Sequence, residues 1–141
     1  MVILDVYVPG LPPSANKLYA NVRGRGRIKT SAYTKFVNET KLYVLQQLTG
    51  NEPAANSDVG HRLEITIFVP NLLTKSWPRA ARFTKLDASN RLKPIEDVVV
   101  SIVGIDDSCF MDACVYKRQG PEGFRIHLAT LEDNAFLSND S

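Results

Sequence analysis

Two short segments in which every second residue is apolar constrain the fold of this chain more than any other feature. Residues 2–8 alternate in this way up to Pro9, and residues 63–69, which are rich in branched side chains, run up to Pro70. A period of two places alternate side chains on one face of a β-strand, and proline ends a strand because it lacks a backbone donor. We therefore predict strands over residues 2–8 and 63–69.

Two further segments have the periodicity of helices. Residues 31–48 mix apolar and polar side chains, with Ser31 as the predicted N-cap. In residues 91–103 apolar side chains recur every three or four positions, and Pro94 falls in the first turn, where proline fits a helix. The three consecutive valines at 98–100 are also typical of a strand, so this second segment has an alternative.

Residues 113–117 and 124–131 are predicted as strands joined by a glycine-containing turn into a hairpin. The order strand, helix, strand, helix, strand, strand indicates an α+β fold: one compact domain with a mixed sheet of about four strands and two main helices. With 141 residues, 44% of them hydrophobic, the chain can bury one core. We place the domain at residues 1–131 and a frayed polar tail at 132–141.

Several classes of protein are excluded. No uncharged apolar run approaches the ~20 residues that cross a bilayer, and the first residues lack the pattern of an export signal. We therefore expect a soluble, unexported protein. Cys109 and Cys114 are too few for a disulfide framework or a zinc site, so we expect reduced thiols packed in the core. His61 and His127, expected at strand edges, lack metal-ligand spacing and are interpreted as structural.

The formal net charge of +2 conceals a strong segregation of charge. Residues 17–41 hold seven basic residues and one acid, residues 75–93 hold six basic residues and one acid, and residues 94–114 hold five acids and no basic residue. The acids of the last segment are Glu96, Asp97, Asp106, Asp107 and Asp112. Basic segments beside a compact acidic one suit a polyanion whose phosphate must approach a metal ion, although solvated surfaces are the alternative.

One local segment has a fixed geometry, and two others each have two interpretations. Residues 11–16 contain two prolines and form a fixed loop. Arginines alternate with glycines at residues 23–27, so an extended chain would point three guanidinium groups one way, whereas a mobile hairpin tip gives the same sequence. Trp77 either stacks on a splayed base or anchors a core or lid.

Three motifs in order resemble one known family. They are residues 11–19, LPPSANKLY, with the Arg/Gly segment after it; residues 85–93, KLDASNRLK, continuing to Glu96 and Asp97; and residues 104–107, GIDD. Together, over residues 2–131, they resemble the RusA-type Holliday junction resolvases, small endodeoxyribonucleases common on phage and prophage genomes. The resemblance implies an enzyme of DNA recombination and repair, in the cytoplasm of a bacterial host and associated with its nucleoid.

The resemblance also implies which residues act. Asp87, Asp107 and Lys93 match the catalytic positions, Asn90 the family's asparagine, and Asp106 lies beside the distal aspartate. The implied ligands of Mg²⁺, with Mn²⁺ as a substitute, are Asp87, Asp107, Asp106 and Ser89, and no organic cofactor is implied. Ser89 stands where the family usually has a second aspartate, and its hydroxyl can bind Mg²⁺ but adds no charge. The structural alternative is capping by Asp87 and Asn90, and a turn at 106–107.

The expected partner is branched DNA, a four-way junction, bound mainly through phosphates. The expected contacts are Asn16, Lys17, Tyr19, Arg23, Arg25, Arg27, Lys29, Lys85, Asn90 and Arg91. Because a junction is resolved by two symmetric nicks, we expect a twofold homodimer, as the family resemblance also implies. Two other classes stay open: a branched-DNA-binding protein made weak or inactive by Ser89, and a small domain whose basic loop contacts RNA or an acidic protein.

Geometry suggests how the dimer is built. A helix over residues 91–103 is roughly 18 to 20 Å long, with Asp87 before it and Asp107 after it. Two carboxylates on one metal ion need oxygens within about 3 to 4 Å of each other. We therefore predict that the helix packs antiparallel to its copy, so that each site takes Asp87 from one subunit and Asp107 from the other.

Overall fold

The computed structural model describes residues 1–14, 19–48, 53 and 55–138, which form six strands and two α-helices. The strands are β1 (Val2–Pro9), β2 (Tyr19–Val22), β3 (Gly26–Lys29), β4 (His61–Val69), β5 (Phe110–Gln119) and β6 (Gly123–Thr130). The helices are α2 (Ser31–Gln47) and α3 (Leu92–Val103), and the 3₁₀ turns are η1 (Ser89–Arg91), η2 (Asp107–Cys109) and η3 (Asp133–Ala135). Every predicted helix and strand is present to within a few residues.

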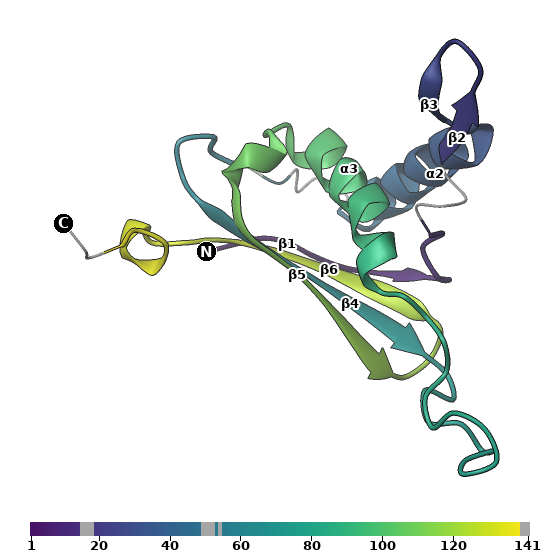
Figure 1. Cartoon of the computed structure of the whole chain (residues 1–141). Helices are drawn as coiled ribbons and strands as arrows, with labels where there is room; N and C mark the ends of the chain where they lie inside the picture. Colours follow the sequence, from purple (N-terminus) through teal and green to yellow (C-terminus); the bar gives the residue numbers. More distant parts are fainter. Residues whose placement is uncertain (15–18, 49–52, 54, 139–141) are drawn as a thin grey trace.

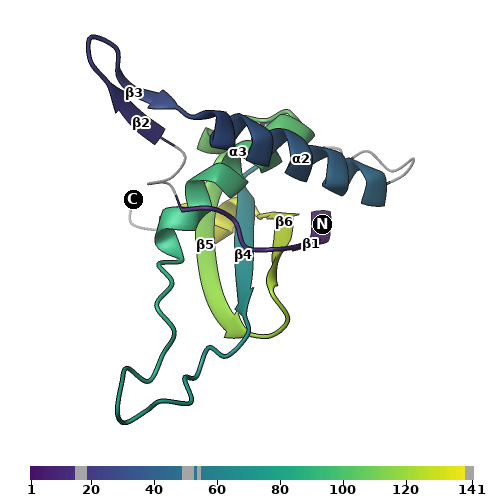
Figure 2. The ribbon, with the colours of Figure 1, turned by 90° about the vertical axis from the view of Figure 1, so that its right-hand side faces the viewer.

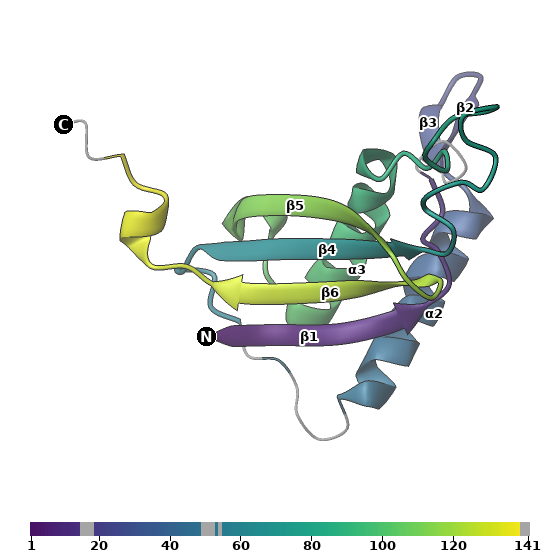
Figure 3. The ribbon, with the colours of Figure 1, turned by 90° about the horizontal axis from the view of Figure 1, so that it is seen from below.

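Four of the strands form one mixed sheet in the order β1-β6-β4-β5 (Figures 1 and 3). β6 is antiparallel to both β1 and β4, whereas β5 is parallel to β4. The prediction of an α+β fold with a mixed four-stranded sheet and two helices is confirmed. The predicted hairpin between the last two strands is wrong, because β4 lies between them. A turn signal shows where the chain reverses, but not which strand it joins.

The burial of β4 explains why it lies between β5 and β6. Leu63, Ile65 and Ile67 of β4 are completely buried, so this strand gains most from an inner position with a partner on each side. The short connection after Gln119 therefore crosses the end of β4 before β6 begins. β5, with its many partly exposed side chains, is left at the edge.

Both helices cover the same face of the sheet (Figures 1 and 2). Ile95, Val98 and Val99 of α3 are fully buried, so the valine run belongs to a helix and the strand alternative is wrong. Pro94 lies in the first turn of α3, as predicted. The predicted cap of α2 is corrected: the residue before the first turn is Thr30, not Ser31, and its side chain makes no capping hydrogen bond.

The segment after β6 is not frayed in its described part. Residues 133–135 form η3, and the Leu131 amide donates to the Gly60 carbonyl at 2.8 Å. The Phe136 ring packs so closely that a Cβ on Gly60 would lie 2.6 Å from it, which explains a glycine there. Of the predicted thiols, Cys109 is buried and Cys114 is half-buried, and both are free.

His61 is buried at the start of β4, and the half-buried His127 lies inside β6 rather than at its edge. Among the residues that the structure describes, no helix has the length and apolar character to span a membrane.

Candidate functional site

Asp87 lies just before η1, and the turn that follows holds its carboxylate. Its Oδ1 accepts from the Ser89 hydroxyl at 2.7 Å and from the Ser89 amide at 3.2 Å, and its Oδ2 accepts from Nδ2 of Asn90 at 2.9 Å. The Ser89 hydroxyl hydrogen bond is the main reason why the pKa of Asp87 lies below its usual value. The capping alternative is wrong, because the N-caps of η1 and α3 are Ala88 and Arg91 and neither makes a side-chain capping hydrogen bond. The hydrogen bonds from Ser89 and Asn90 instead form a turn that leaves Asp87 exposed, oriented and ionised.

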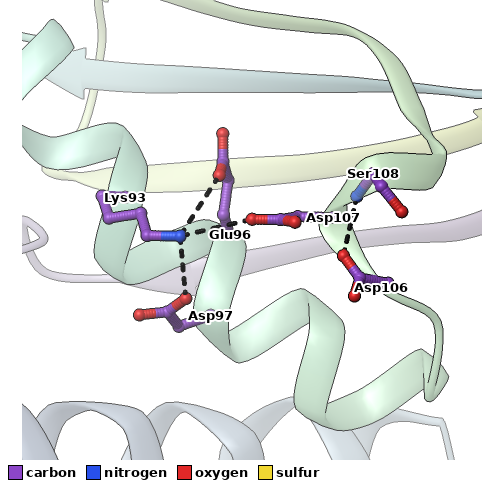
Figure 4. A network of polar contacts seen from close by, with 6 residues as sticks. All are labelled: Lys93, Glu96, Asp97, Asp106, Asp107 and Ser108. Carbon is purple, nitrogen blue, oxygen red and sulfur yellow. Dashed lines mark hydrogen bonds and ion pairs between the residues drawn. The ribbon is translucent and has the colours of Figure 1, made fainter.

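Lys93, the second residue of α3, gathers three carboxylates around its ammonium group (Figure 4). Its Nζ lies 3.4 Å from Asp107 Oδ2, 3.4 Å from Asp97 Oδ1 and 4.0 Å from Glu96 Oε2. We call Lys93, Glu96, Asp97 and Asp107 the lysine-carboxylate cluster. Three negative charges share one positive charge, so the cluster has an excess of negative charge.

Partial burial makes the charge of two of these acids costly. Burial raises the pKa values of Glu96 and Asp97, while the charges of Lys93 on Glu96 and of Lys29 on Asp97 act in the opposite direction. Their side chains are less exposed than those of Lys93 and Asp107. An anionic cluster with this arrangement favours the approach of a further cation.

The position of Asp107 corrects a geometric expectation. Asp107 was expected past the far end of α3, but its carboxylate contacts the second residue of that helix. Gly104, with a left-handed φ of 75°, ends α3 and turns the chain back, and its amide donates to the Val100 carbonyl at 2.9 Å. The length of α3 therefore does not force the two aspartates into different subunits. That each site takes one aspartate from each subunit remains a prediction, but the length of α3 no longer supports it.

Asp106, which precedes η2, and Asp107, its first residue, make different contacts. Asp106 caps the turn by accepting from the Ser108 amide at 2.9 Å, and this hydrogen bond lowers its pKa. Asp107 points the other way, toward Lys93 (Figure 4). The expected turn is thus present at Asp106, and the functional role of the adjacent Asp107 stays a prediction.

The donor types of the site fit Mg²⁺, which prefers carboxylate oxygens and usually takes only one or two of them alongside water. Within the described ranges, no three His, Cys, Asp or Glu side chains are already arranged as a metal site. The cation at the centre of the lysine-carboxylate cluster is the Lys93 ammonium. The oxygens are therefore present, but they contact a lysine.

Glu96 and Asp97 had no assigned role in the sequence, although they belong to the cluster. A signal was available, because they follow Lys93 by three and four residues, the spacing that places side chains on one helix face. Asp107 could join them only through the turn at Gly104, which spacing along a helix does not reveal.

The Arg/Gly segment is the tip of a hairpin, so the hairpin interpretation is confirmed. β2 and β3 are antiparallel, with Gly24 and Gly26 at positive φ in and after the turn. Arg23, Arg25 and Arg27 are exposed on it. The hairpin projects from the same side of the molecule as the start of α3 (Figures 1 and 2). At its base, the Lys29 ammonium lies 4.6 Å from the centre of the Tyr33 ring.

The other expected DNA contacts are placed as follows. Arg91 is half-buried, and its guanidinium donates to the Pro12 carbonyl, so it fastens the loop at residues 11–14 to η1. Lys85 is exposed. Tyr19 begins β2, where its backbone pairs with Lys29. Asn16 and Lys17 lie outside the described residues.

The comparisons with known proteins give one finding. A family model described as endodeoxyribonuclease RusA matches residues 9–129. No curated protein matches the chain. The matched range contains Asp87, η1, α3 and the complete lysine-carboxylate cluster.

Proposed function

Since the chain belongs to the endodeoxyribonuclease RusA family, which implies Holliday junction resolvase activity, we propose that it hydrolyses phosphodiester bonds of four-way DNA in a Mg²⁺-dependent reaction. The observation that carries the metal dependence is the lysine-carboxylate cluster, with three acids on one ammonium group. A phosphodiester is itself an anion, so an additional cation is needed before it can approach this cluster.

We assign Asp87 and Asp107 as the carboxylates that hold Mg²⁺, with Asp106 and Ser89 beside them. Asp87 is suited to this because hydrogen bonds from Ser89 and Asn90 fix its orientation and keep it ionised. When bound, Mg²⁺ supplies Lewis-acid chemistry at the scissile phosphate, with Mn²⁺ as a substitute. Asn90 is a positioning residue, since it acts on Asp87.

Lys93 has the second catalytic role. Its ammonium group carries the charge that stabilises negative charge developing on the phosphate. In the structure its position is fixed by ion pairs with Asp97, Asp107 and Glu96. Asp97 and Glu96 therefore act as positioning residues for Lys93.

DNA binds through the basic residues beside the site. Arg23, Arg25 and Arg27 on the β2–β3 hairpin, with Lys29 and Lys85, supply phosphate contacts, so affinity falls steeply as salt rises. Two subunits place two symmetric nicks, so the working form is a homodimer acting in the cytoplasm at the nucleoid. The domain that does this is residues 1–131.

A second candidate function is supported by one contact. The Ser89 hydroxyl, which stands where the family usually has an aspartate, donates to Asp87 at 2.7 Å. A hydroxyl engaged in this way adds no negative charge for a metal ion. A branched-DNA-binding protein with weak or no hydrolysis is the function that follows from it.

The test is incubation of the purified protein with a labelled four-way junction, a linear duplex and a single strand, with and without Mg²⁺. Paired nicks on the junction that require Mg²⁺ support the proposal. Tight and selective junction binding without nicks, under Mg²⁺ and under Mn²⁺, supports the second function. Equal indifference to all three DNAs contradicts both, and leaves a domain that contacts RNA or an acidic protein.

A further inference from the structure

The segment between β4 and η1 forms an arm that projects beyond the end of the sheet (Figures 1 and 2). We call residues 71–84 the aromatic arm. The Thr74 amide donates to the Arg82 carbonyl at 2.8 Å, and the Thr84 amide donates to the Leu72 carbonyl at 2.9 Å. Two short stretches of backbone are thus paired as in a hairpin, so the arm has a defined shape.

The base of the arm is fastened to β5. The Leu73 amide donates to Oε1 of Gln119 at 3.2 Å, and Nζ of Lys117 donates to the Leu86 carbonyl at 3.1 Å. Lys117 and Gln119 lie near the end of the edge strand. These bonds fix the direction in which the arm leaves the sheet.

Two large rings on this arm face solvent. Trp77 is 55% exposed and Phe83 is 56% exposed, so the interpretation of Trp77 as a core anchor is wrong. The Arg82 guanidinium carbon lies 5.2 Å from the Trp77 ring centre and 5.8 Å from that of Phe83, which makes one cationic and aromatic surface. Rings that stay this exposed gain little of the stabilisation that burial gives, so packing within the chain does not account for them.

The charge around these rings has one sign. Residues 70–86 include Lys75, Arg79, Arg82 and Lys85 and no acidic residue. A surface that combines exposed aromatic rings with positive charge is complementary to nucleic acid, whose bases stack on rings and whose phosphates attract lysine and arginine. An apolar protein partner would not need four basic residues here.

The arm also lies beside the candidate active site. Phe83 precedes Asp87 by four residues, so the arm leads directly into the candidate active site. The arm and the β2–β3 hairpin leave the same side of the molecule, with the start of α3 between them (Figures 1 and 2). DNA held against Asp87 and Lys93 is therefore within reach of both projections.

We propose that the aromatic arm recognises the branch point itself: Trp77 and Phe83, with the Arg82 guanidinium, stack on base faces that lack a stacking neighbour at the centre of a four-way junction. This inference rests on the proposed function and deepens it. The β2–β3 hairpin supplies contacts to phosphates, which every DNA offers, whereas the arm supplies contacts that only unstacked bases offer. The two projections together make binding selective for branched DNA.

The experiment uses the fact that Trp77 is the only tryptophan of the chain, so its fluorescence reports on the arm alone. The full-length protein is titrated, in EDTA, with a four-way junction and with a linear duplex of the same sequence, and binding is followed by anisotropy of a DNA label. We expect Trp77 emission to be quenched on the junction and unchanged on the duplex. Saturated junction binding with unchanged Trp77 emission would overturn the proposal.

Variants separate stacking from charge. Trp77→Ala and Phe83→Ala should each weaken junction binding roughly tenfold and leave duplex binding unchanged, and Trp77→Phe should retain most of the affinity. Leu73→Ala is the matched control, since Leu73 is 49% exposed on the same arm but has no ring. Equal losses on junction and duplex, or a loss with Leu73→Ala as large as with Trp77→Ala, would overturn the proposal.

The outcomes distinguish a failure of the aromatic-arm proposal from a failure of the proposed hydrolysis. Quenching on the junction without nicks in Mg²⁺ or Mn²⁺ supports the arm and contradicts the proposed hydrolysis. Nicking that Trp77→Ala and Phe83→Ala leave unchanged, with no quenching, supports hydrolysis and contradicts the arm. If these substitutions instead turn a sedimenting dimer into a monomer and DNA affinity per subunit is unchanged, the rings bind a second copy of the chain and the proposal is overturned.

Discussion

The two faces of this molecule treat acidic residues in opposite ways. On the face of the sheet that the helices do not cover, two aspartates form ion pairs, each with its own arginine. Asp5 accepts hydrogen bonds from Nε and Nη2 of Arg125 at 2.8 and 2.7 Å, and Asp112 is paired with Arg62 at 2.8 Å. On the helical face three carboxylates share the ammonium group of Lys93. We call the first the balanced face, because its ion pairs match one acid to one arginine, and the second the unbalanced face, because of this cluster.

We interpret this difference as one between structural charge and charge that serves the proposed function. One-to-one pairs join neighbouring strands, β1 with β6 and β4 with β5, and nothing further is needed to neutralise them. The lysine-carboxylate cluster keeps a negative excess that a bound cation would remove, and two of its acids have pKa values raised by burial. A chain optimised only for stability would not retain such an excess.

Asp107→Asn should reduce activity more than any other single substitution. This change removes a proposed metal-holding charge while the fold and the basic projections remain. The nicking rate on a labelled four-way junction in Mg²⁺ should fall roughly a hundredfold or more, with junction affinity retained.

Asp112→Asn is the matched control on the balanced face, since it removes an aspartate that is paired with an arginine. It should leave the nicking rate within about a factor of two, because surface ion pairs contribute little to stability. Equal losses of activity for the two substitutions would remove the distinction between the faces.

Lys93→Met tests the cation at the centre of the cluster. Without the ammonium group, Glu96, Asp97 and Asp107 repel one another and the proposed stabilisation of the phosphate is lost. Nicking should fall roughly ten- to a hundredfold at saturating Mg²⁺. The protein should also gain more thermal stability from added Mg²⁺ than the wild type does, as measured by the melting temperature with and without the ion.

Lys93→Arg keeps the charge and should retain more activity than Lys93→Met. A purely structural lysine would give a different pattern, in which the melting temperature drops but the rate per folded molecule does not change.

Ser89→Asp adds a negative charge to the unbalanced face. A second carboxylate beside Asp87 should strengthen Mg²⁺ binding, so half-maximal nicking should need roughly tenfold less Mg²⁺. The measurement is the nicking rate against Mg²⁺ concentration. Ser89→Ala removes the hydroxyl that donates to Asp87 at 2.7 Å and should shift the curve to higher Mg²⁺. An unchanged curve for both variants contradicts the assigned role of this position.

Local sequence patterns predicted the strands, the helices and their approximate bounds, because periodicity, proline and glycine act over a few residues. They failed where distant segments choose partners: β5 was expected to pair with β6, but the fully buried β4 lies between them. The same limit applies at the site. Asp107 was placed beyond the far end of α3, since the left-handed turn at Gly104 and the reach of the Lys93 side chain are not visible as periodicity.

The exposure of single side chains was the second property that the sequence did not predict. A single tryptophan in a basic segment had two interpretations, and only the position of Trp77 on the aromatic arm separates them. Arg91 is the opposite case. It was expected to contact DNA, but the residue is half-buried and its guanidinium fastens the loop at residues 11–14. The residue type was informative in both cases, but its surroundings decided the role.

On the balanced face, Asp5→Asn should change the protein only slightly. The hydrogen bond from Arg125 lowers the pKa of Asp5 below its ordinary value of 3.8, so the ionised form is favoured in the folded protein. The contribution to the free energy of unfolding is therefore present above the unfolded pKa and is lost as the pH falls through the folded pKa. Because the pair is largely exposed, the loss at about pH 7 should be below about 1 kcal/mol.

Urea unfolding of the wild type and of Asp5→Asn at about pH 7 and about pH 2.5 measures this difference, which should shrink or vanish at the lower pH. A double-mutant cycle with Arg125→Met isolates the pair from other effects of the substitutions. Nicking activity should not change, because neither residue belongs to the lysine-carboxylate cluster. A difference that grows toward low pH would reverse the sign of the argument, and a loss of nicking would mean that charge on the sheet face also serves the reaction.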